Sequence, residues 1–493
     1  MGIMRNNMDI DVKHKKNTIY SIIKSVSAII FPLITFPYSS RVLGVENYGK
    51  LNFANSIIVY FALFASLGIA TYAIRECAKV KDNRQELSIV ASQLYSINLA
   101  STLLSYLFLI VALLVSYKLR NYLLLICIYS SSIVFNTAGA EWINIALGEY
   151  KYITIRGLLS NLVSIILMFI FVHDADDYIV LAIITATATS GANVMNIFYR
   201  RKFCSVKPTF HVNLKKHLPP ILLMFAIILV QEVFVASDTT IIGFLLDDKA
   251  VGLYSAATKI YRLPSAITNS LSNVLLPTLS VAFAINDTEQ IKKTLRYGVN
   301  FLSLIGFPCV AGLIIFSKEI IGLSSSDQYI SAATTLSILG VSYLATLFGM
   351  VVTNFIIIAN KKDKVCFWSC LVSAIINIVL NFIFIPIYGI VAAAFTTALS
   401  NIVVVLIELP YIKRGLFDRS VISVIIKPLI ATIILVGWLF LTKILVTDRV
   451  WVVVVGVIAG ALLYFLANIL MKEEMTTDFC VSILHKIKKK NSK

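Results

Sequence analysis

The sequence predicts an all-α integral membrane protein with about fourteen transmembrane helices. Of its 493 residues, 58% are hydrophobic and only 14% are charged, a balance that would leave a soluble domain with far too much apolar surface in water. The apolar residues also form runs of roughly 20–30 residues, and a helix needs about 20 to cross a bilayer. Because a helix satisfies its own backbone hydrogen bonds in lipid, we expect each run to be one spanning helix.

Short polar breaks separate the runs and set the ends of the expected spans. The run at 251–284 is too long for one straight span, so we expect a tilt, or a kink at Pro264 or Pro277. The expected spans are 19–43, 50–74, 88–117, 121–147, 153–172, 178–199, 219–246, 251–284, 297–323, 330–359, 365–385, 388–411, 421–442 and 450–471.

Lys and Arg residues gather in every second break. Both ends of the chain are basic, and the basic breaks are 75–86, 148–156, 200–217, 285–296, 360–364 and 412–420. The breaks that alternate with them hold few bases. By the positive-inside rule, we expect the basic breaks and both termini to be cytoplasmic. The first run is too long for the core of a signal peptide, so we expect it to be retained. The net charge of +17 then follows from loops near anionic lipid headgroups and requires no nucleic-acid partner.

The chain also repeats itself after about 200 residues. The end of the first span, Arg41–Gly44, matches Thr240–Gly243 at the end of the seventh, and a Tyr-Gly or Val-Gly pair follows each. Similarly, Leu162–Phe171 in the fifth span matches Ile375–Phe384 in the eleventh. Each unit holds an even number of spans, so the two units are expected to be parallel repeats related by an axis along the membrane normal. Chance similarity between apolar segments is the alternative, and the matched glycines disfavour it.

This repeat predicts the domain organisation. We expect a six-helix lobe at 1–207, a second six-helix lobe at 208–415, and an appended helix pair with a basic cytoplasmic tail at 416–493.

One segment carries a resemblance to a known family. Pro37–Leu51 closes the first span, opens the second, and reads Pro-Tyr-Ser-Ser-Arg-Val-Leu-Gly-Val-Glu-Asn-Tyr-Gly-Lys-Leu. With this segment and its layout of six, six and two spans, the whole chain resembles the Wzx-type polysaccharide-transport flippases of the multidrug/oligosaccharidyl-lipid/polysaccharide (MOP) exporter superfamily. The resemblance implies a V-shaped bundle whose two six-helix lobes open alternately to either side of the membrane.

The resemblance also implies a substrate and partners. Such flippases move undecaprenyl-diphosphate-linked oligosaccharides from the inner to the outer leaflet of the bacterial plasma membrane, for assembly of surface polysaccharide such as O-antigen of lipopolysaccharide or capsule. The expected partners are the polyprenyl-diphosphate oligosaccharide and membrane lipids, and the resemblance leaves room for association with a glycan polymerase. H⁺ and Na⁺ both stay open as the coupling ion, and no metal or other cofactor is expected.

The densest group of charges inside the spans lies on the seventh and eighth. Asp238 and Lys259 are each about eight residues from the outer break at 246–251, and Glu232 and Arg262 lie deeper, so a helical hairpin would set acids against bases. We interpret Lys259 and Arg262 as contacts of an anionic diphosphate. Glu232 and Asp238 would hold these bases or bind the coupling ion. A salt-bridge set that only joins two helices is the alternative.

Three further charges are candidates in the first lobe. Arg41 belongs to the segment that resembles the family, so we expect it in the cavity; otherwise it snorkels to the interface. Lys24 is a candidate for the same cavity, with a snorkelling anchor as the alternative. Glu141 is expected to line the inner gate, or to pair with a base of the neighbouring loop.

Two other functions are alternatives. A cation-coupled multidrug exporter of the same superfamily would have twelve spans and no appended pair. A membrane glycan polymerase, an enzyme, would have a large outer loop, whereas the outer breaks here are short. The sequence also has no Walker A, GxSxG or HExxH motif, so we expect a transporter rather than an enzyme.

Overall fold

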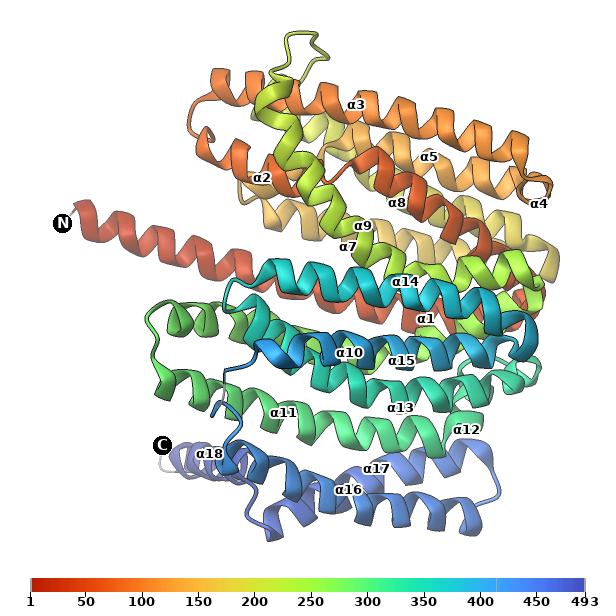
Figure 1. Cartoon of the computed structure of the whole chain (residues 1–493), viewed down its shortest axis with the longest axis vertical. Coiled ribbons are helices and arrows are strands. Elements are labelled where there is room, and N and C mark those ends of the chain that lie inside the picture. Colours follow the sequence, from red (N-terminus) through yellow and green to blue (C-terminus); the bar gives the residue numbers. More distant parts are fainter. Residues whose placement is uncertain (1, 414, 492–493) are drawn as a thin grey trace. The chain divides into compact units, whose positions relative to one another are not determined.

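The computed structural model describes residues 2–413 and 415–491, with side chains described for 20, 23–27, 30–413 and 415–482. Its regular elements are helices, with no strand in the described residues (Figure 1). The helices are α1 (Gly2–Ser66), α2 (Ile69–Lys79), α3 (Arg84–Val115), α4 (Tyr117–Arg120), α5 (Leu123–Gly139), α6 (Glu141–Ala146), α7 (Tyr150–Phe171), α8 (Tyr178–Tyr199), α9 (Leu214–Leu245), α10 (Asp248–Ala284), α11 (Thr288–Ile315), α12 (Ser317–Ser324), α13 (Ala333–Met350), a π-helical segment (Val351–Ile358), α14 (Asp363–Tyr388), α15 (Ile390–Glu408), α16 (Arg419–Leu445), α17 (Arg449–Leu470) and α18 (Glu474–Asn491), with short 3₁₀ turns between some of them.

Among the described residues, 12 helices are long and apolar enough to cross a membrane. One of them, Ile23–Lys79, contains two expected spans, and the shorter apolar helix α5 continues into α6 to cover the expected span 121–147. Every expected span therefore has its helix, and the predicted all-α membrane fold class is confirmed. α10 runs as one helix through both of its prolines.

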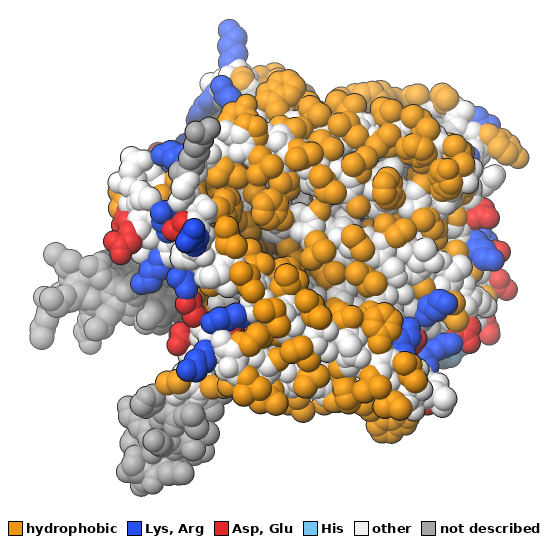
Figure 2. Space-filling view, turned by 60° about the horizontal axis from the view of Figure 1, so that its bottom comes forward, with side chains coloured by type: hydrophobic (Ala, Val, Ile, Leu, Met, Phe, Trp, Pro, Cys, Tyr) orange, Lys and Arg blue, Asp and Glu red, His pale blue; other side chains and the backbone are white. Residues whose placement is uncertain are grey.

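The surface of the helices agrees with a lipid environment. Many large hydrophobic side chains are more than half exposed, as in Val115, Phe171 and Leu470. In the face shown in Figure 2, hydrophobic side chains cover the flanks of the helices, whereas Lys, Arg, Asp and Glu gather towards their ends. In water such a surface would drive aggregation, whereas in a bilayer it matches the solvent. The chain is therefore a multi-pass membrane protein.

Contacts divide the chain into two compact units, Met1–Gly252 and Leu253–Lys493. In the first unit, α1 packs against α3, α5, α7 and α9, and α8 packs against α5 and α7. In the second unit, α13 packs against α11 and α15, α14 packs against α15, and α16 packs against α11 and α17. The predicted lobe boundaries at 207 and 415 follow the sequence repeat rather than these contacts, and they stay a prediction.

Three glycines shape the first unit. At Gly44, φ is 72° and ψ is 174°, a left-handed backbone that breaks α1 between the first and second expected spans. At Gly49, an added Cβ would lie 1.7 Å from the carbonyl oxygen of Asp248. Conversely, a Cβ on Gly252 would lie 2.1 Å from the carbonyl oxygen of Val45. Each oxygen belongs to the residue four positions before the opposite glycine, so α1 and α10 cross backbone to backbone at matching positions of the predicted repeat.

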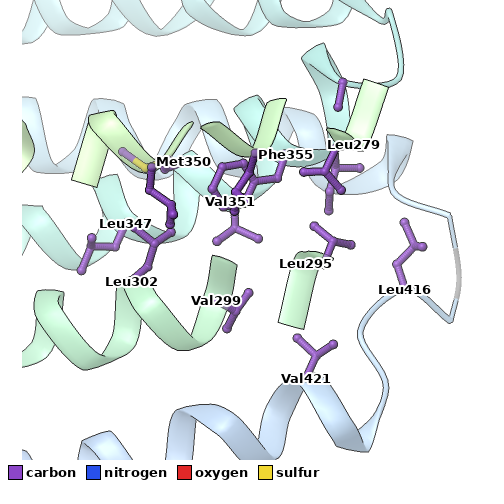
Figure 3. Packing of buried hydrophobic residues seen from close by; sticks show 14 of the residues in the cluster. Leu279, Leu295, Val299, Leu302, Leu347, Met350, Val351, Phe355, Leu416 and Val421 are labelled. Atoms are coloured by element: carbon purple, nitrogen blue, oxygen red, sulfur yellow. The ribbon is translucent and has the colours of Figure 1, made fainter. Parts of the chain in front are cut away.

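The core of the second unit anchors the start of α16. Leu416 and Val421 lie on either side of the first residue of α16 and are buried with Leu279, Leu295 and other apolar residues of α10, α11 and α13 (Figure 3). Asp418 caps this helix, because its side chain accepts hydrogen bonds from the backbone N–H groups of Ser420 and Val421 at 2.9 and 3.2 Å.

Removing this cap gives a first testable prediction. The hydroxyl of Ser420, these two N–H groups and Lys292 lower the pKa of Asp418 to about 2. This pKa lies below the usual value of about 3.9. Ionised Asp418 therefore stabilises the folded protein fully above about pH 3.9, and this stabilisation is lost as the pH falls towards 2. We expect Asp418→Ala to lower the melting temperature of the detergent-solubilised protein at pH 7 by about 1–3 °C. The decrease should vanish near pH 2, and Asp82→Ala, at an exposed acid, is the control.

Candidate functional site

A cavity of about 550 Å³ lies inside the first unit, and residues of α1, α2, α3, α5, α6, α7 and α8 line it. Its walls carry many amides and hydroxyls, in a bundle whose outer surface is apolar. Polar groups in a membrane bundle generally face a wet path or one another, so this cavity is the first place to look for a substrate. The amides and hydroxyls of its walls include Asn98, Ser132, Asn136, Thr137, Asn161 and Asn193.

A helix break brings an acid to this cavity. α5 ends at Gly139, Ala140 has a φ of 48°, and α6 begins at Glu141. Asn196 of α8 donates to the carbonyl oxygen of Gly139 at 2.8 Å, and its own side-chain oxygen accepts from Asn144 at 2.6 Å. The carbonyl freed by the break is thereby satisfied from a neighbouring helix, as lipid requires. α8 thus fixes both sides of the break and with it the position of Glu141.

Glu141 holds two bases. Its Oε1 accepts a hydrogen bond from Lys24 Nζ at 2.9 Å, and its Oε2 accepts one from Arg156 Nη2. The exposed fractions of the Lys24, Glu141 and Arg156 side chains are 50%, 25% and 3%. We call these three residues the charged triad. With two cations and one anion, the triad carries a net positive charge inside the bundle.

Two nitrogens of the Arg156 guanidinium are not used in the ion pair with Glu141. Its Nε and Nη1 are buried and make no hydrogen bond of ordinary geometry to a described residue. Its Cζ lies 5.5 Å from the ring centroid of Tyr152, and this ring stacks on Tyr199 at 3.5 Å between centroids. A guanidinium fixed in this way offers two N–H groups to an acceptor such as a phosphate oxygen, which it binds in a planar fork.

The structure brings two of the predicted site residues together. Lys24 and Glu141 are 117 residues apart in sequence, and both line the cavity. Glu141 also pairs with Arg156, a base of the break at 148–156, and its role at an inner gate stays a prediction. Arg41 is exposed on α1, three residues before Gly44. Its place in a substrate cavity stays a prediction.

The other four predicted site residues lie on α9 and α10. Glu232 is half-buried and Asp238 is buried on α9, in the first unit. Lys259 is half-buried and Arg262 is exposed on α10, in the second unit. The pairing of these acids with these bases stays a prediction.

Sequence reasoning missed Arg156, which it counted among the loop bases. The helix α7 begins at Tyr150, before the apolar run does, so Arg156 lies within the helix and is buried. A detectable signal is the acid at Glu141, fifteen residues earlier, because an acid inside one span calls for a base on its neighbour.

Comparison with known proteins agrees with this fold. The "Polysaccharide biosynthesis protein" family matches residues 14–283, more than half of the chain, and the MatE family matches residues 220–383. The chain is 23% identical over 406 residues to the "Putative O-antigen transporter" of Escherichia coli (strain K12), covering 81% of this chain and 97% of the relative. It is 25% identical over 243 residues to the "Probable low-salt glycan biosynthesis flippase Agl15" of Haloferax volcanii, covering 49% of this chain and 51% of the relative.

Solved structures show the same fold. A structure of "Lipid II flippase MurJ, inward closed conformation" matches with a TM-score of 0.75 and 18% identity, over 93% of this chain and 99% of that one. An inward-facing multidrug resistance MATE family transporter of the MOP superfamily matches with a TM-score of 0.59 and 15% identity, over 79% and 96%. The predicted resemblance to the flippases of this superfamily is confirmed, and the chain belongs to the polysaccharide biosynthesis protein family.

Proposed function

We propose that this protein is a flippase for a polyprenyl-diphosphate-linked oligosaccharide. It would move the lipid-linked glycan from the inner to the outer leaflet of a bacterial plasma membrane, with both chain termini in the cytoplasm. Relatives named as an O-antigen transporter and a glycan biosynthesis flippase support the substrate class. The observation that carries the proposal is the polar cavity with its net positive triad, because such a substrate has an anionic diphosphate and a hydroxyl-rich glycan.

The triad would receive the diphosphate. Nε and Nη1 of Arg156 would donate to one phosphate, and Nζ of Lys24, half of whose side chain is exposed, would donate to the other. Glu141 would hold both bases in place before the substrate arrives, which lowers the entropy lost on binding. Because Glu141 cancels only one of the two positive charges, the site attracts anions yet can release them.

The amides of the cavity wall would receive the sugars. Asn98, Asn136, Asn161 and Asn193 carry both donors and acceptors, as sugar hydroxyls do. The polyprenyl tail would stay in the lipid beside the helices. The site would then be exposed to one side of the membrane and afterwards to the other, as in other transporters built from repeats.

The remaining predicted residues keep proposed roles in this cycle. Arg41, Lys259 and Arg262 are further candidate contacts of the headgroup, and Glu232 and Asp238 are candidate partners of these bases. H⁺ or Na⁺ would drive transport, and a glycan polymerase would take the product.

Reconstitution of the purified protein tests the function directly. Liposomes would contain a fluorescent polyprenyl-diphosphate oligosaccharide, and a membrane-impermeant quencher would report how much of it is on the outer leaflet. We expect the protein to speed translocation at least about 100-fold over empty liposomes, because the headgroup alone crosses lipid at high cost. A rate equal to that of empty liposomes contradicts the proposal. Transport of a cationic dye instead would indicate the multidrug exporter, and lengthening of the glycan would indicate the polymerase.

A further inference from the structure

A second buried charge site lies in the second unit, at the end of α15. Glu408 is its last residue, and its exposed fraction is 0%. None of the ion pairs within the described residues includes it. A carboxylate in such a place lacks both water and a cation, which makes its charged form costly.

Two hydroxyl groups hold the carboxyl. Thr353 Oγ1 donates to Oε2 at 2.6 Å, and Ser369 Oγ donates to Oε1 at 2.7 Å. A hydroxyl is both a donor and an acceptor, so either partner can rotate and accept a hydrogen bond from the O–H of the protonated carboxyl. The site therefore accommodates both the charged and the neutral acid with the same side chains, which a lysine or arginine partner would not allow.

The neighbouring helices carry few other charges near this carboxyl. The first turns of α14 contribute Asp363, the exposed Lys364 and the thiols of Cys366 and Cys370, and the π-helical segment contributes no titratable side chain. After α15, Tyr411 offers its backbone oxygen to Lys362 Nζ at 2.9 Å. No cation within the described residues thus lies within ion-pair distance of Glu408, and the proton is its simplest counter-charge.

The predicted repeat sharpens this contrast between the two halves of the chain. The difference of 213 positions that carries Leu162 onto Ile375 also carries Arg156 onto Ser369. In the first unit, the arginine at this position pairs with an acid, Glu141. In the second unit, the serine at this position donates to an acid, Glu408. The matched position thus holds an arginine that pairs with an acid of α6 in one half, and a serine that donates to an acid of α15 in the other.

A change at Glu408 has a direct route to a membrane helix. Thr353 lies in the π-helical segment Val351–Ile358, and π-helical turns are rare and concentrate at functional sites. The next residue, Asn354, donates to Ser272 Oγ of α10 at 3.2 Å. α10 also carries Arg262, about 15 Å along the helix from Ser272.

From this geometry we infer that Glu408 is a proton-binding site that couples proton movement to transport. When a proton binds, the carboxyl of Glu408 donates a hydrogen bond to Thr353 instead of accepting one from it. This reversal changes the contact with the π-helical segment and, through Asn354, the contact of that segment with α10. The coupling to transport rests on the proposed function, whereas proton binding itself does not.

Infrared difference spectroscopy of the purified full-length protein tests proton binding without any substrate. The spectrum of the wild type minus that of Glu408→Gln should contain the carbonyl band of a protonated carboxylic acid, and the band should disappear as the pH is raised. Glutamine keeps the size and the hydrogen-bonding capacity of the side chain, so folding should be preserved. The absence of this band at every pH overturns the inference. Glu289→Gln, at an exposed acid of α11, should leave the band unchanged.

Reconstituted liposomes then test the coupling. With an imposed pH gradient, wild-type translocation should be at least about tenfold faster than without one, which corresponds to a difference of about 1.4 kcal/mol. Glu408→Gln should translocate at one rate with and without the gradient, whereas Glu289→Gln should respond as the wild type does. If the wild type translocates but ignores the gradient, or if Glu408→Gln still responds to it, the coupling is overturned and the proposed function stands. If the wild type translocates nothing, the proposed function fails, and the coupling inferred from it fails too; the infrared band then decides proton binding alone.

Discussion

Arg156→Ala is expected to reduce translocation by at least about 100-fold. The substitution removes Nε and Nη1, the two buried donors that the proposed function assigns to a phosphate, and hydrogen bonds to charged groups contribute about 1.5–3 kcal/mol each. Arg156→Lys should recover only part of the rate, because it restores the charge without the planar fork. The measurement is polysaccharide export in a cell that lacks its own flippase, together with binding of a polyprenyl diphosphate to the purified protein. Arg84→Ala is the control, since this exposed arginine only donates to a loop carbonyl.

A structural role for the ion pair needs a separate test. Removing Arg156 leaves Glu141 with Lys24 as its partner, so some loss of folded protein is expected along with the loss of transport. The double variant Arg156→Gln and Glu141→Gln removes both charges of the buried pair and leaves Lys24, half of whose side chain is exposed, as the remaining charge. We expect it to restore the amount of protein in the membrane but not the transport. Recovery of transport in the double variant would show that the pair only holds helices together.

Gly49→Ala is expected to have the largest effect on stability. The new Cβ would overlap the carbonyl oxygen of Asp248, and backbone atoms cannot rotate away as a side chain can. α1 and α10 would have to separate at their crossing, at a cost of about 3 kcal/mol or more. The measurement is the melting temperature and the yield of monodisperse protein in detergent. Gly191→Ala in α8 is the matched control, because nothing lies within 4 Å of its Cβ.

The partner glycine provides a check on the cause. Gly252→Ala meets the carbonyl oxygen of Val45 at the same crossing, so it should be as harmful as Gly49→Ala. Once the helices have separated to make room for one methyl group, a second methyl group should cost little more. The decrease in melting temperature of the double variant should therefore be well below the sum of the two single decreases. Equal melting temperatures for Gly49→Ala and Gly191→Ala would rule out the backbone contact as the reason for glycine.

The fold was predictable because lipid imposes a simple rule on the sequence. Each apolar run had to be a helix, and even the two short pieces α5 and α6 occupy one expected span. The ends of helices were less predictable, because polar residues at an interface belong equally well to a helix or to a loop. Arg156 was therefore assigned to a loop, although α7 begins six residues before it. Glu408 lies near the end of the expected span 388–411 and was not among the candidate residues, and only the packing shows that it is buried.

The candidate site was only half predictable for a related reason. The cost of a charge in lipid marks Lys24 and Glu141 as residues that need a partner, and it says nothing about which partner. The two are 117 residues apart, and the contact depends on how α1 packs against its neighbours. No local pattern encodes that packing. The same reasoning leaves Lys259, Arg262, Glu232 and Asp238 as residues in need of partners that the sequence cannot choose among.

The ion pair between Glu141 and Arg156 also bears on biosynthesis. The two residues are only fifteen positions apart, at the start of α6 and six residues into the next helix, α7, so they emerge from the ribosome almost together. A single charge at the centre of an inserting helix costs about 2.5–3.5 kcal/mol, and a hairpin that enters with its charges already paired avoids much of this cost. Lys24 emerges far earlier and has no such neighbour in its own hairpin. We expect Glu141, which organises the finished cavity, to act first during insertion, where its pairing with Arg156 lowers the free-energy cost of moving this arginine into the membrane.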